Sequence, residues 1–314
     1  MFKPITRTLL FFGVLCLLLI PVNRVLSPKN NTQEAGMHKA SANAIRSQGE
    51  HSIDVLFLGD SEAYSGFVPL ELWHGRGIPS FVCSSLDQKT YETVELLEMA
   101  LSCQSPRVVV LETNVLYRVY PSTEAIVPAM EAYFPALRYH DRWKTLTLRD
   151  FTQRPSYTAL SPDRGYHLLL EAEPAELEGY MRPMEEWEPL SRQNRRNLQR
   201  IAELCQEHGA QLLLFSVPSP TNWTVRRHNT MVDTGNELGV PYLDGNLLEL
   251  GIDWQTDTYD AGDHLNYYGA AKVTDWLGAY LAEHYDLPDR RGDPAYTQWD
   301  EDYLDFQQRL RRGE

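Results

Sequence analysis

An apolar run that ends abruptly in a polar turn constrains the fold of this chain more than any other feature. Residues 53–58 read Ile-Asp-Val-Leu-Phe-Leu, and Gly59 stops the run before Asp60 and Ser61. A short run of this kind with β-branched members is typical of a buried strand in a parallel sheet. The turn therefore places Asp60 and Ser61 at the carboxyl edge of the sheet, where ligands and catalytic groups gather.

Further strands and helices alternate along the chain around this first strand. The other strands are predicted at residues 79–83, 107–111, 211–215 and 240–244. Amphipathic helices are predicted between and after them, at residues 90–101, 190–208, 222–238 and from 266 onwards. This alternation is the pattern of a parallel sheet covered by helices. We therefore predict an α/β fold, a three-layer α/β/α sandwich around a five-stranded parallel sheet.

The alternation breaks over about residues 115–190. Aromatic residues and prolines are frequent there, and no strand pattern appears. Long segments of this kind are usually functional or disordered, and the aromatic content argues against disorder. We predict an inserted helical and loop region, which is either a cap over a substrate site or a structural elaboration.

The N-terminal segment is apolar enough to enter a membrane. Residues 9–22 carry no charge, and they are flanked by Lys3 and Arg7 on one side and Arg24 on the other. Their length lies between that of a signal-peptide core and the roughly 20 residues of a spanning helix. No small-residue cleavage pattern follows, which favours an uncleaved signal anchor. We expect a single-pass protein of the cell membrane with its main domain outside the cytoplasm.

These features predict four parts of the chain. Residues 1–26 are the anchor and residues 27–50 a tether. Residues 51–285 are the α/β domain with its insertion, and residues 286–314 are a C-terminal tail, which is expected either to pack on the domain as a helix or to form a partner contact.

Charge and motif content exclude several classes of function. The net charge is −14, and residues 31–314 carry 25 basic against 43 acidic side chains, which disfavours nucleic acid as a partner. Neither a Gly-x-Gly-x-x-Gly nor a Walker loop occurs, and the cysteines show no metal-binding spacing. We expect no cofactor, no metal and no nucleic acid.

A second polar loop supplies the group that Ser61 needs. Residues 257–266 read Asp-Thr-Tyr-Asp-Ala-Gly-Asp-His-Leu-Asn, with Asn266 as the N-cap of the last helix. This loop opens at the same edge of the sheet as Ser61. A serine hydroxyl becomes a good nucleophile when an imidazole takes its proton and a carboxylate orients that imidazole. We therefore expect His264 and Ser61 to meet in one site.

Together these motifs resemble the SGNH/GDSL hydrolase superfamily, whose fold is a flavodoxin-like α/β/α sandwich. The resemblance covers roughly residues 52–285 and depends on Gly59-Asp60-Ser61, on Asn114 after the third strand, and on the Asp-His-Leu-Asn before the last helix. It implies that Ser61 is the nucleophile and His264 the base. It also implies that the Asn114 side-chain amide and the Ser61 backbone N–H bind the oxyanion.

The sequence departs from this family in the carboxylate that orients the histidine. The family usually has an aspartate three residues before it, and that position here is Ala261. Asp260 and Asp263 both remain candidates: an extended loop favours Asp260, whereas a tight turn at Gly262 would favour Asp263. The second oxyanion donor, often a glycine after the second strand, is replaced by the segment Ser84-Ser85.

The anchored arrangement further resembles a subgroup that modifies cell-envelope polymers, as in lipoteichoic acid D-alanylation and alginate acetylation. It implies a serine esterase or O-acyltransferase that acts on acylated glycans or small esters through an acyl-enzyme, with an integral-membrane O-acyltransferase as a partner. A cluster after the fourth strand either lines a sugar site or only packs: Trp223, Arg226, Arg227 and His228. The alternative is a non-catalytic assembly or glycan-binding protein with the same fold.

Overall fold

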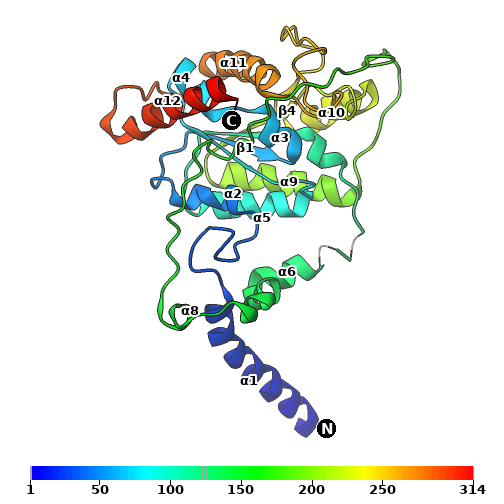
Figure 1. Cartoon of the computed structure of the whole chain (residues 1–314). Coiled ribbons are helices and arrows are strands. Elements are labelled where there is room, and N and C mark those ends of the chain that lie inside the picture. Colours follow the sequence, from blue (N-terminus) through cyan, green and yellow to red (C-terminus); the bar gives the residue numbers. More distant parts are fainter. Residues whose placement is uncertain (1, 122, 125, 314) are drawn as a thin grey trace. The chain divides into compact units, whose positions relative to one another are not determined.

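A five-stranded parallel sheet forms the centre of the structure, a computed structural model that describes residues 2–121, 123–124 and 126–313 (Figure 1). Its strands are β1 (Val55–Gly59), β2 (Ser80–Ser84), β3 (Val108–Glu112), β4 (Gln211–Ser216) and β5 (Tyr242–Asp244). Their spatial order is β2-β1-β3-β4-β5, and every neighbouring pair is parallel. The predicted sheet is confirmed.

The strands are short apolar runs because the sheet is covered on both faces. Strands β1, β2 and β3 are buried along their whole length. The register aligns their carboxyl ends, since Gly59 lies opposite Ser84 in β2 and Glu112 lies opposite Phe215 in β4. The residues that follow these strands therefore share one edge of the sheet.

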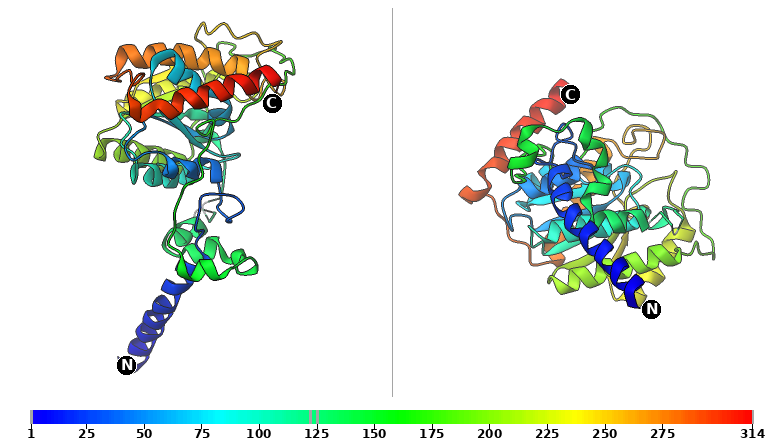
Figure 2. Two further views of the ribbon diagram at one scale, coloured as in Figure 1. Left: turned by 60° about the vertical axis from the view of Figure 1, so that its left-hand side comes forward. Right: turned by 90° about the horizontal axis from the view of Figure 1, so that it is seen from below.

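Helices form a layer on each face of the sheet, so the predicted three-layer sandwich is also confirmed. Helices α5 and α9 pack together on one face, and α4, α11 and α12 pack on the other (Figures 1 and 2). The helices around the sheet are α2 (Ala40–Asn43), α3 (Ser61–Gly66), α4 (Pro69–Arg76), α5 (Thr90–Leu101), α9 (Arg192–Glu207), α10 (Val225–Leu238), α11 (Tyr267–His284) and α12 (Thr297–Arg312). Short 3-10 turns accompany them: η1 (Ala44–Ser47), η2 (Thr113–Tyr117) and η4 (Pro294–Tyr296).

The chain divides into two compact units. Unit 1 comprises Met1–Ala40 with Tyr120–Ala159, and unit 2 comprises Ser41–Val119 with Leu160–Glu314. Unit 2 contains the sheet and the C-terminal helix α12, which buries Trp299 and Phe306. The part of the expected insertion beyond residue 159 runs along unit 2 without helix or strand until α9 begins.

Unit 1 is helical. Its elements are α1 (Phe2–Leu26), α6 (Ile126–Tyr133), α7 (Pro135–Arg138), η3 (His140–Lys144) and α8 (Leu148–Thr152). Within α1, the 22 residues Ile5–Leu26 have a mean hydropathy of 2.3 and are not buried in the protein. This helix is long and apolar enough to cross a bilayer, a property that it shares with signal sequences.

Candidate functional site

The turn after β1 is shaped by the close approach of α3 and β3. A Cβ at position 59 would lie 2.8 Å from the Cβ atoms of both Ala63 and Glu112, so glycine is required there. Asp60 is the N-cap of α3, and its carboxylate accepts the Glu62 backbone N–H at 3.2 Å. Ser61 is consequently the first residue of α3, at the carboxyl edge of the sheet.

Asp60 ties this turn to the residues that follow β3. Its buried carboxylate accepts hydrogen bonds from Arg118 Nε at 2.5 Å and from Asn114 Nδ2 at 3.3 Å. Burial raises the pKa of Asp60, and the Arg118 guanidinium opposes that rise; His264 adds a smaller effect of the same sign as Arg118. Asp60 therefore links the turn after β1 to Asn114 and Arg118 after β3, and His264 lies near enough to affect its pKa.

His264 lies on a tight hairpin between β5 and α11. The hairpin is closed by an antiparallel bridge between Thr258 and Leu265, and Ala261 and Gly262 turn the chain with φ values of 55° and 95°. This geometry folds Asp260 back onto His264. The Asp260 carboxylate accepts the His264 backbone N–H at 2.6 Å and lies 2.7 Å from its Nδ1.

Asp260, rather than Asp263, is therefore the carboxylate in hydrogen-bonding position. The shortest distance from Asp263 to His264 Nδ1 is 3.8 Å, which is too long for a hydrogen bond. Because Asp260 accepts from Nδ1, the other ring nitrogen is left as the basic one in neutral imidazole. His264 Nε2 is buried and has no hydrogen-bond partner among the described residues.

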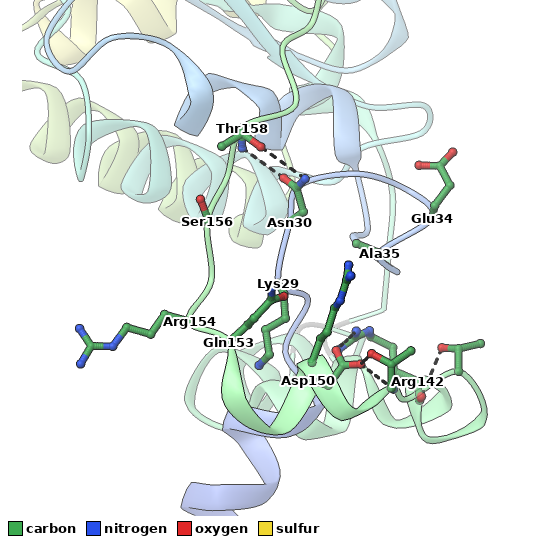
Figure 3. Close-up of a pocket in the computed structure, with 13 residues that line it drawn as sticks. Lys29, Asn30, Glu34, Ala35, Arg142, Asp150, Gln153, Arg154, Ser156 and Thr158 are labelled. Carbon is green, nitrogen blue, oxygen red and sulfur yellow. Dashed lines mark hydrogen bonds and ion pairs between the residues drawn. The ribbon is translucent and has the colours of Figure 1, made fainter.

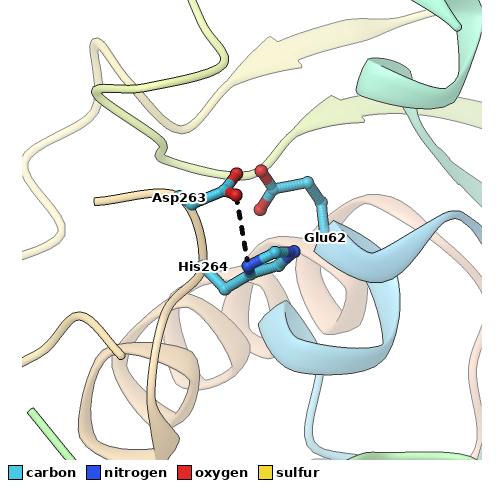
Figure 4. Close-up of side chains that lie close together, drawn as sticks. All are labelled: Glu62, Asp263 and His264. Atoms are coloured by element: carbon cyan, nitrogen blue, oxygen red, sulfur yellow. Dashed lines mark ion pairs between the residues drawn. The ribbon is translucent and has the colours of Figure 1, made fainter. Parts of the chain in front are cut away.

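The histidine hairpin and the start of α3 come together. A carboxylate oxygen of Glu62, one of Asp263 and a ring nitrogen of His264 lie within 4.8 Å of one another. Figure 4 shows these three side chains gathered between the start of α3 and the histidine hairpin. Asn222 bridges the two carboxylates, since its Nδ2 donates to Glu62 Oε1 at 2.6 Å and also to Asp263. Two loops about 200 residues apart in the sequence thus form one site.

Ser61 itself makes no hydrogen bond through its Oγ to any residue that the structure describes. The residue is 2% exposed, and the bond from its hydroxyl to His264 Nε2 is not formed. Catalytic hydrogen bonds are often long in unliganded proteins and tighten when substrate binds. The structure therefore brings Ser61 and His264 to one edge of the sheet without a hydrogen bond between their side chains.

Asn114 is positioned beside this turn. Its backbone N–H donates to the Glu112 carboxylate at 2.9 Å, and its Oδ1 accepts from Arg227 at 3.1 Å. This bond fixes the amide so that Nδ2 faces Asp60, and one N–H of Nδ2 has no acceptor among the described residues. Ser84, in register with Gly59, has a buried Oγ without a partner among the described residues.

Glu62 and Asn222 are site residues that the sequence did not indicate. Glu62 follows Ser61 in the first turn of a helix, where an acidic residue usually faces solvent, yet it is buried. Burial raises its pKa well above the ordinary value, and the nearby Glu112 and Asp60 raise it further. A sequence signal for Asn222 is absent because its role depends on two loops that meet only in the fold.

Three members of the cluster after β4 pack against neighbouring side chains, whereas Arg226 is exposed and pairs with Glu186. The Trp223 indole is buried and donates to Asp244 at 3.0 Å, and His228 Nδ1 lies 2.7 Å from the same carboxylate. Arg227 stacks on the Tyr117 ring with its guanidinium carbon 4.4 Å from the centroid. Of this cluster, Arg227 contacts the site through its hydrogen bond to Asn114.

Three side chains of this site lie close enough together to be compared with a cation site. Glu62, Asp263 and His264 have the ligand types for a cation and form such a group within the part of the chain that the structure describes. The Asn222 amide, however, already donates to both carboxylates. It occupies one oxygen of each carboxylate, and the buried Glu62 Oε2 has no hydrogen-bond partner among the described residues.

The fold and the site define the class of this protein: an α/β/α sandwich with serine, histidine and aspartate at the carboxyl edge of its sheet. No protein-family model matches the chain, and no curated protein matches it.

Solved structures with a similar fold share little sequence with the chain. A putative SGNH hydrolase from Slackia heliotrinireducens is 12% identical, with 73% of this chain and 99% of the other covered and a TM-score of 0.42. The esterase EstA from Pseudoalteromonas sp. is 11% identical, covers 73% and 96%, and has a TM-score of 0.40. A putative acylhydrolase from Bacteroides fragilis is 11% identical, covers 77% and 92%, and has a TM-score of 0.38. Likeness at this level assigns neither a family nor a function.

Proposed function

We propose that this chain is a membrane-anchored, extracytoplasmic serine esterase or O-acyltransferase of SGNH type. The observation that carries the proposal is the pair formed by Asp260 and His264 beside the first turn of α3, in which the buried Nε2 of His264 has no hydrogen-bond partner among the described residues. An oriented imidazole next to a serine at a helix start has the parts of an activated nucleophile. Its substrates are ester-linked acyl groups of cell-envelope glycans; that class, and an integral-membrane O-acyltransferase as partner, come from the sequence resemblance.

The proposed reaction proceeds through an acyl-enzyme. Ser61 Oγ attacks the acyl carbonyl while its proton passes to His264 Nε2, and Asp260 stabilises the imidazolium. The oxyanion is held by the Ser61 backbone N–H and the Asn114 amide. The tetrahedral intermediate collapses as His264 returns the proton to the leaving alcohol. Water or a glycan hydroxyl then attacks the ester on Ser61, and His264 again transfers the proton.

Labelling with a fluorophosphonate probe tests the activated serine. We expect covalent capture of the wild-type protein. The labelling rate should fall at least about 100-fold in Ser61→Ala, which removes the proposed nucleophile, and in His264→Ala, which removes the proposed base. Ser102→Ala is the matched control, since this exposed serine only donates to the Met99 carbonyl. Labelling that persists in Ser61→Ala would reject Ser61 as the nucleophile.

A second candidate function is a non-catalytic assembly or glycan-binding protein. It is favoured by one observation: Ser61 is 2% exposed and forms no hydrogen bond with His264. The two candidates differ in how Ser61→Ala affects cells. Envelope modification that continues in the variant supports the non-catalytic role, whereas its loss, together with probe labelling of the wild type, supports the enzyme.

A further inference from the structure

Unit 1 differs from unit 2 in charge. Residues 1–40 and 120–159 carry ten basic and five acidic side chains, a net charge of +5, or +3 without Lys3 and Arg7 at the far end of α1, whereas the remaining residues carry a net charge of −19. A basic unit within an acidic protein is suited to an anionic surface. The partner of unit 1 is therefore expected to be negatively charged.

The short helices of unit 1 are hydrogen-bonded to the C-terminal end of α1. The Ala136 backbone N–H donates to Asn23 Oδ1 at 2.9 Å, and the Arg142 guanidinium donates to the Leu26 carbonyl at 2.7 Å. The apolar stretch of α1 ends at Leu26. If α1 crosses a bilayer, as proposed above, its end lies at the membrane surface, and α7 and η3 are held at that level.

These same helices expose large apolar side chains. Leu148 is 87% exposed, Tyr133 is 81% exposed and Trp143 is 66% exposed. The exposed apolar residues of residues 126–151, called the collar here, are Ile126, Val127, Met130, Tyr133, Leu137, Trp143, Leu148 and Phe151. So many in a short segment mark an interaction surface. Aromatic and aliphatic side chains beside a spanning helix suit the headgroup and acyl boundary of a bilayer.

A basic pocket lies within the same unit. It has a volume of about 430 Å³ and is lined by Lys29, Arg142, Arg149 and Arg154, together with Glu34 and Asp150. Figure 3 shows Arg142 paired with Asp150 and Arg154 extended away from the other side chains. Arg149 and Arg154 form no ion pair with the described residues. These cations are available for phosphate groups next to the apolar surface.

We infer that the collar docks on the surface of an anionic bilayer, with its apolar side chains in the headgroup layer and the basic pocket facing lipid phosphates. This role rests on the proposed anchoring by α1. It goes beyond that anchoring, because α1 alone could hold the protein on the membrane without any contact between the collar and lipid. Continuity with the apolar helix and the positive charge favour lipid over a second protein as the occupant.

Tryptophan quenching tests this docking in the full chain. Trp143 is the single tryptophan of unit 1, and the other six belong to unit 2. The protein is placed in nanodiscs of phosphatidylcholine, with or without phosphatidylglycerol, that contain brominated lipid. We expect bromolipid to quench a component of the emission that is lost in Trp143→Phe. That component should be quenched more strongly when phosphatidylglycerol is present at low salt.

Matched variants in the Trp143→Phe background locate the contact. Leu148→Trp should restore the quenching, whereas Leu304→Trp should not, since Leu304 is an exposed leucine of unit 2. Equal quenching at both positions would reject specific docking of the collar. Equal quenching with and without phosphatidylglycerol would reject the role of charge.

Failure of the anchoring and failure of the docking give different results. A protein that is released from membranes by alkaline carbonate and does not enter nanodiscs contradicts both. A protein that co-elutes with nanodiscs while Trp143 stays unquenched retains its anchor and overturns the docking on lipid. Trp143 that becomes shielded only in native membranes would point to a protein as the occupant and equally overturn it.

Discussion

At the scale of single residues, the histidine hairpin determines which carboxylate acts on the imidazole. Asp260 holds both the backbone N–H and Nδ1 of His264, so one side chain fixes the position and the tautomer of the ring. Asp263 instead accepts from Asn222. We therefore propose separate roles for the two aspartates: Asp260 orients the imidazole, and Asp263 supports the wall of the site.

Substitution of each aspartate separates these roles. We expect Asp260→Asn to lower the rate of fluorophosphonate labelling by about 10³- to 10⁴-fold, because an amide donor toward Nδ1 favours the wrong tautomer. Asp263→Asn should lower it by less than about tenfold, because its carboxylate lies beyond hydrogen-bonding distance of the ring. Second-order labelling rates at fixed pH measure the difference. A larger loss in Asp263→Asn than in Asp260→Asn would contradict the assignment.

The sequence could predict that the loops of Ser61 and His264 lie at one edge of the sheet, but not which aspartate contacts the imidazole. The loop of Ser61 follows a recognisable strand and the loop of His264 precedes a recognisable helix, so the position of both loops at the carboxyl edge of the sheet was predictable. The choice depends on Ala261 and Gly262 in left-handed conformations. Alanine seldom adopts a positive φ, and nothing local in the sequence indicates that it does so here. Each of the two alternatives for this loop was correct in one respect. The turn is tight, as in the alternative that favoured Asp263, but Asp260 is the aspartate that contacts the ring.

Glu62 makes stability depend on pH. Burial, followed by the charges of Glu112 and Asp60, raises its pKa well above the ordinary 4.5. The folded state thus holds this proton more tightly than the unfolded state. Its contribution to the free energy of unfolding is complete below pH 4.5 and is lost as the pH rises through the raised folded-state pKa. We expect Glu62→Gln to flatten this decline.

Urea unfolding between about pH 5 and pH 8 measures the free energy of unfolding for wild type and variant. Glu301→Gln is the control, since Glu301 is an exposed glutamate of α12 and its loss should leave the pH dependence unchanged. An identical slope in wild type and Glu62→Gln would show that Glu62 does not hold its proton in the folded state.

At the scale of elements, the C-terminal helix α12 completes the core of unit 2. Phe306 is fully buried, with ring centroids of Tyr166 and Tyr267 at 6.3 Å and 5.7 Å in edge-to-face geometry. The Arg164 guanidinium is buried over Trp299 at 4.4 Å and pairs with Asp302. The helix is therefore an integral part of the fold.

Truncation of Phe306 should be costly for this reason. We expect Phe306→Ala to lower the free energy of unfolding of unit 2 by about 3–5 kcal/mol, the usual cost of removing a buried aromatic ring. Leu304→Ala, two residues away and 63% exposed, should change it by no more than about 0.5 kcal/mol. Urea unfolding followed by near-ultraviolet circular dichroism compares the two. Equal effects would show that α12 is not packed as described.

The elements of the sheet were predictable because they are local, whereas the insertion was not. Each strand is a short apolar run with its own stop signal, and α11 begins at Asn266, whose side chain accepts the Tyr268 and Gly269 N–H groups. In the insertion, α6, α7 and α8 have eight residues or fewer. Helices this short are stabilised by packing rather than by their own sequence.

At the scale of the whole molecule, the division into two units could not be predicted from local patterns. It depends on contacts more than 100 residues apart, such as those from Ala136 to Asn23 and from Arg142 to Leu26. The opposite net charges of the units were available in the sequence, but only the fold shows which segments belong together. The two units thus differ in the sign of their net charge, and the positively charged unit is the one that contains the apolar helix α1.

The direction in which α1 crosses a membrane depends on a competition between basic residues at its two ends. Lys3 and Arg7 precede the uncharged residues 9–22 of α1, and Arg24 and Lys29 follow them. Lysine and arginine favour the cytoplasmic side, so the flanks oppose each other. The proposed action on envelope glycans requires Lys3 and Arg7 to prevail, which places unit 2 outside.

A C-terminal alkaline phosphatase fusion reports this orientation, because the enzyme is active only outside the cytoplasm. We expect the full chain to give an active fusion, and the paired substitution Lys3→Gln and Arg7→Gln to lower that activity several-fold by weakening the cytoplasmic flank. The matched pair Arg24→Gln and Lys29→Gln removes the same charge from the other end of α1 and should leave the activity at or above the wild-type level. An inactive phosphatase together with a fluorescent cytoplasmic fusion in the wild type would place the Ser61 site inside the cell, where envelope glycans are not exposed, and the glycan substrate would have to be abandoned.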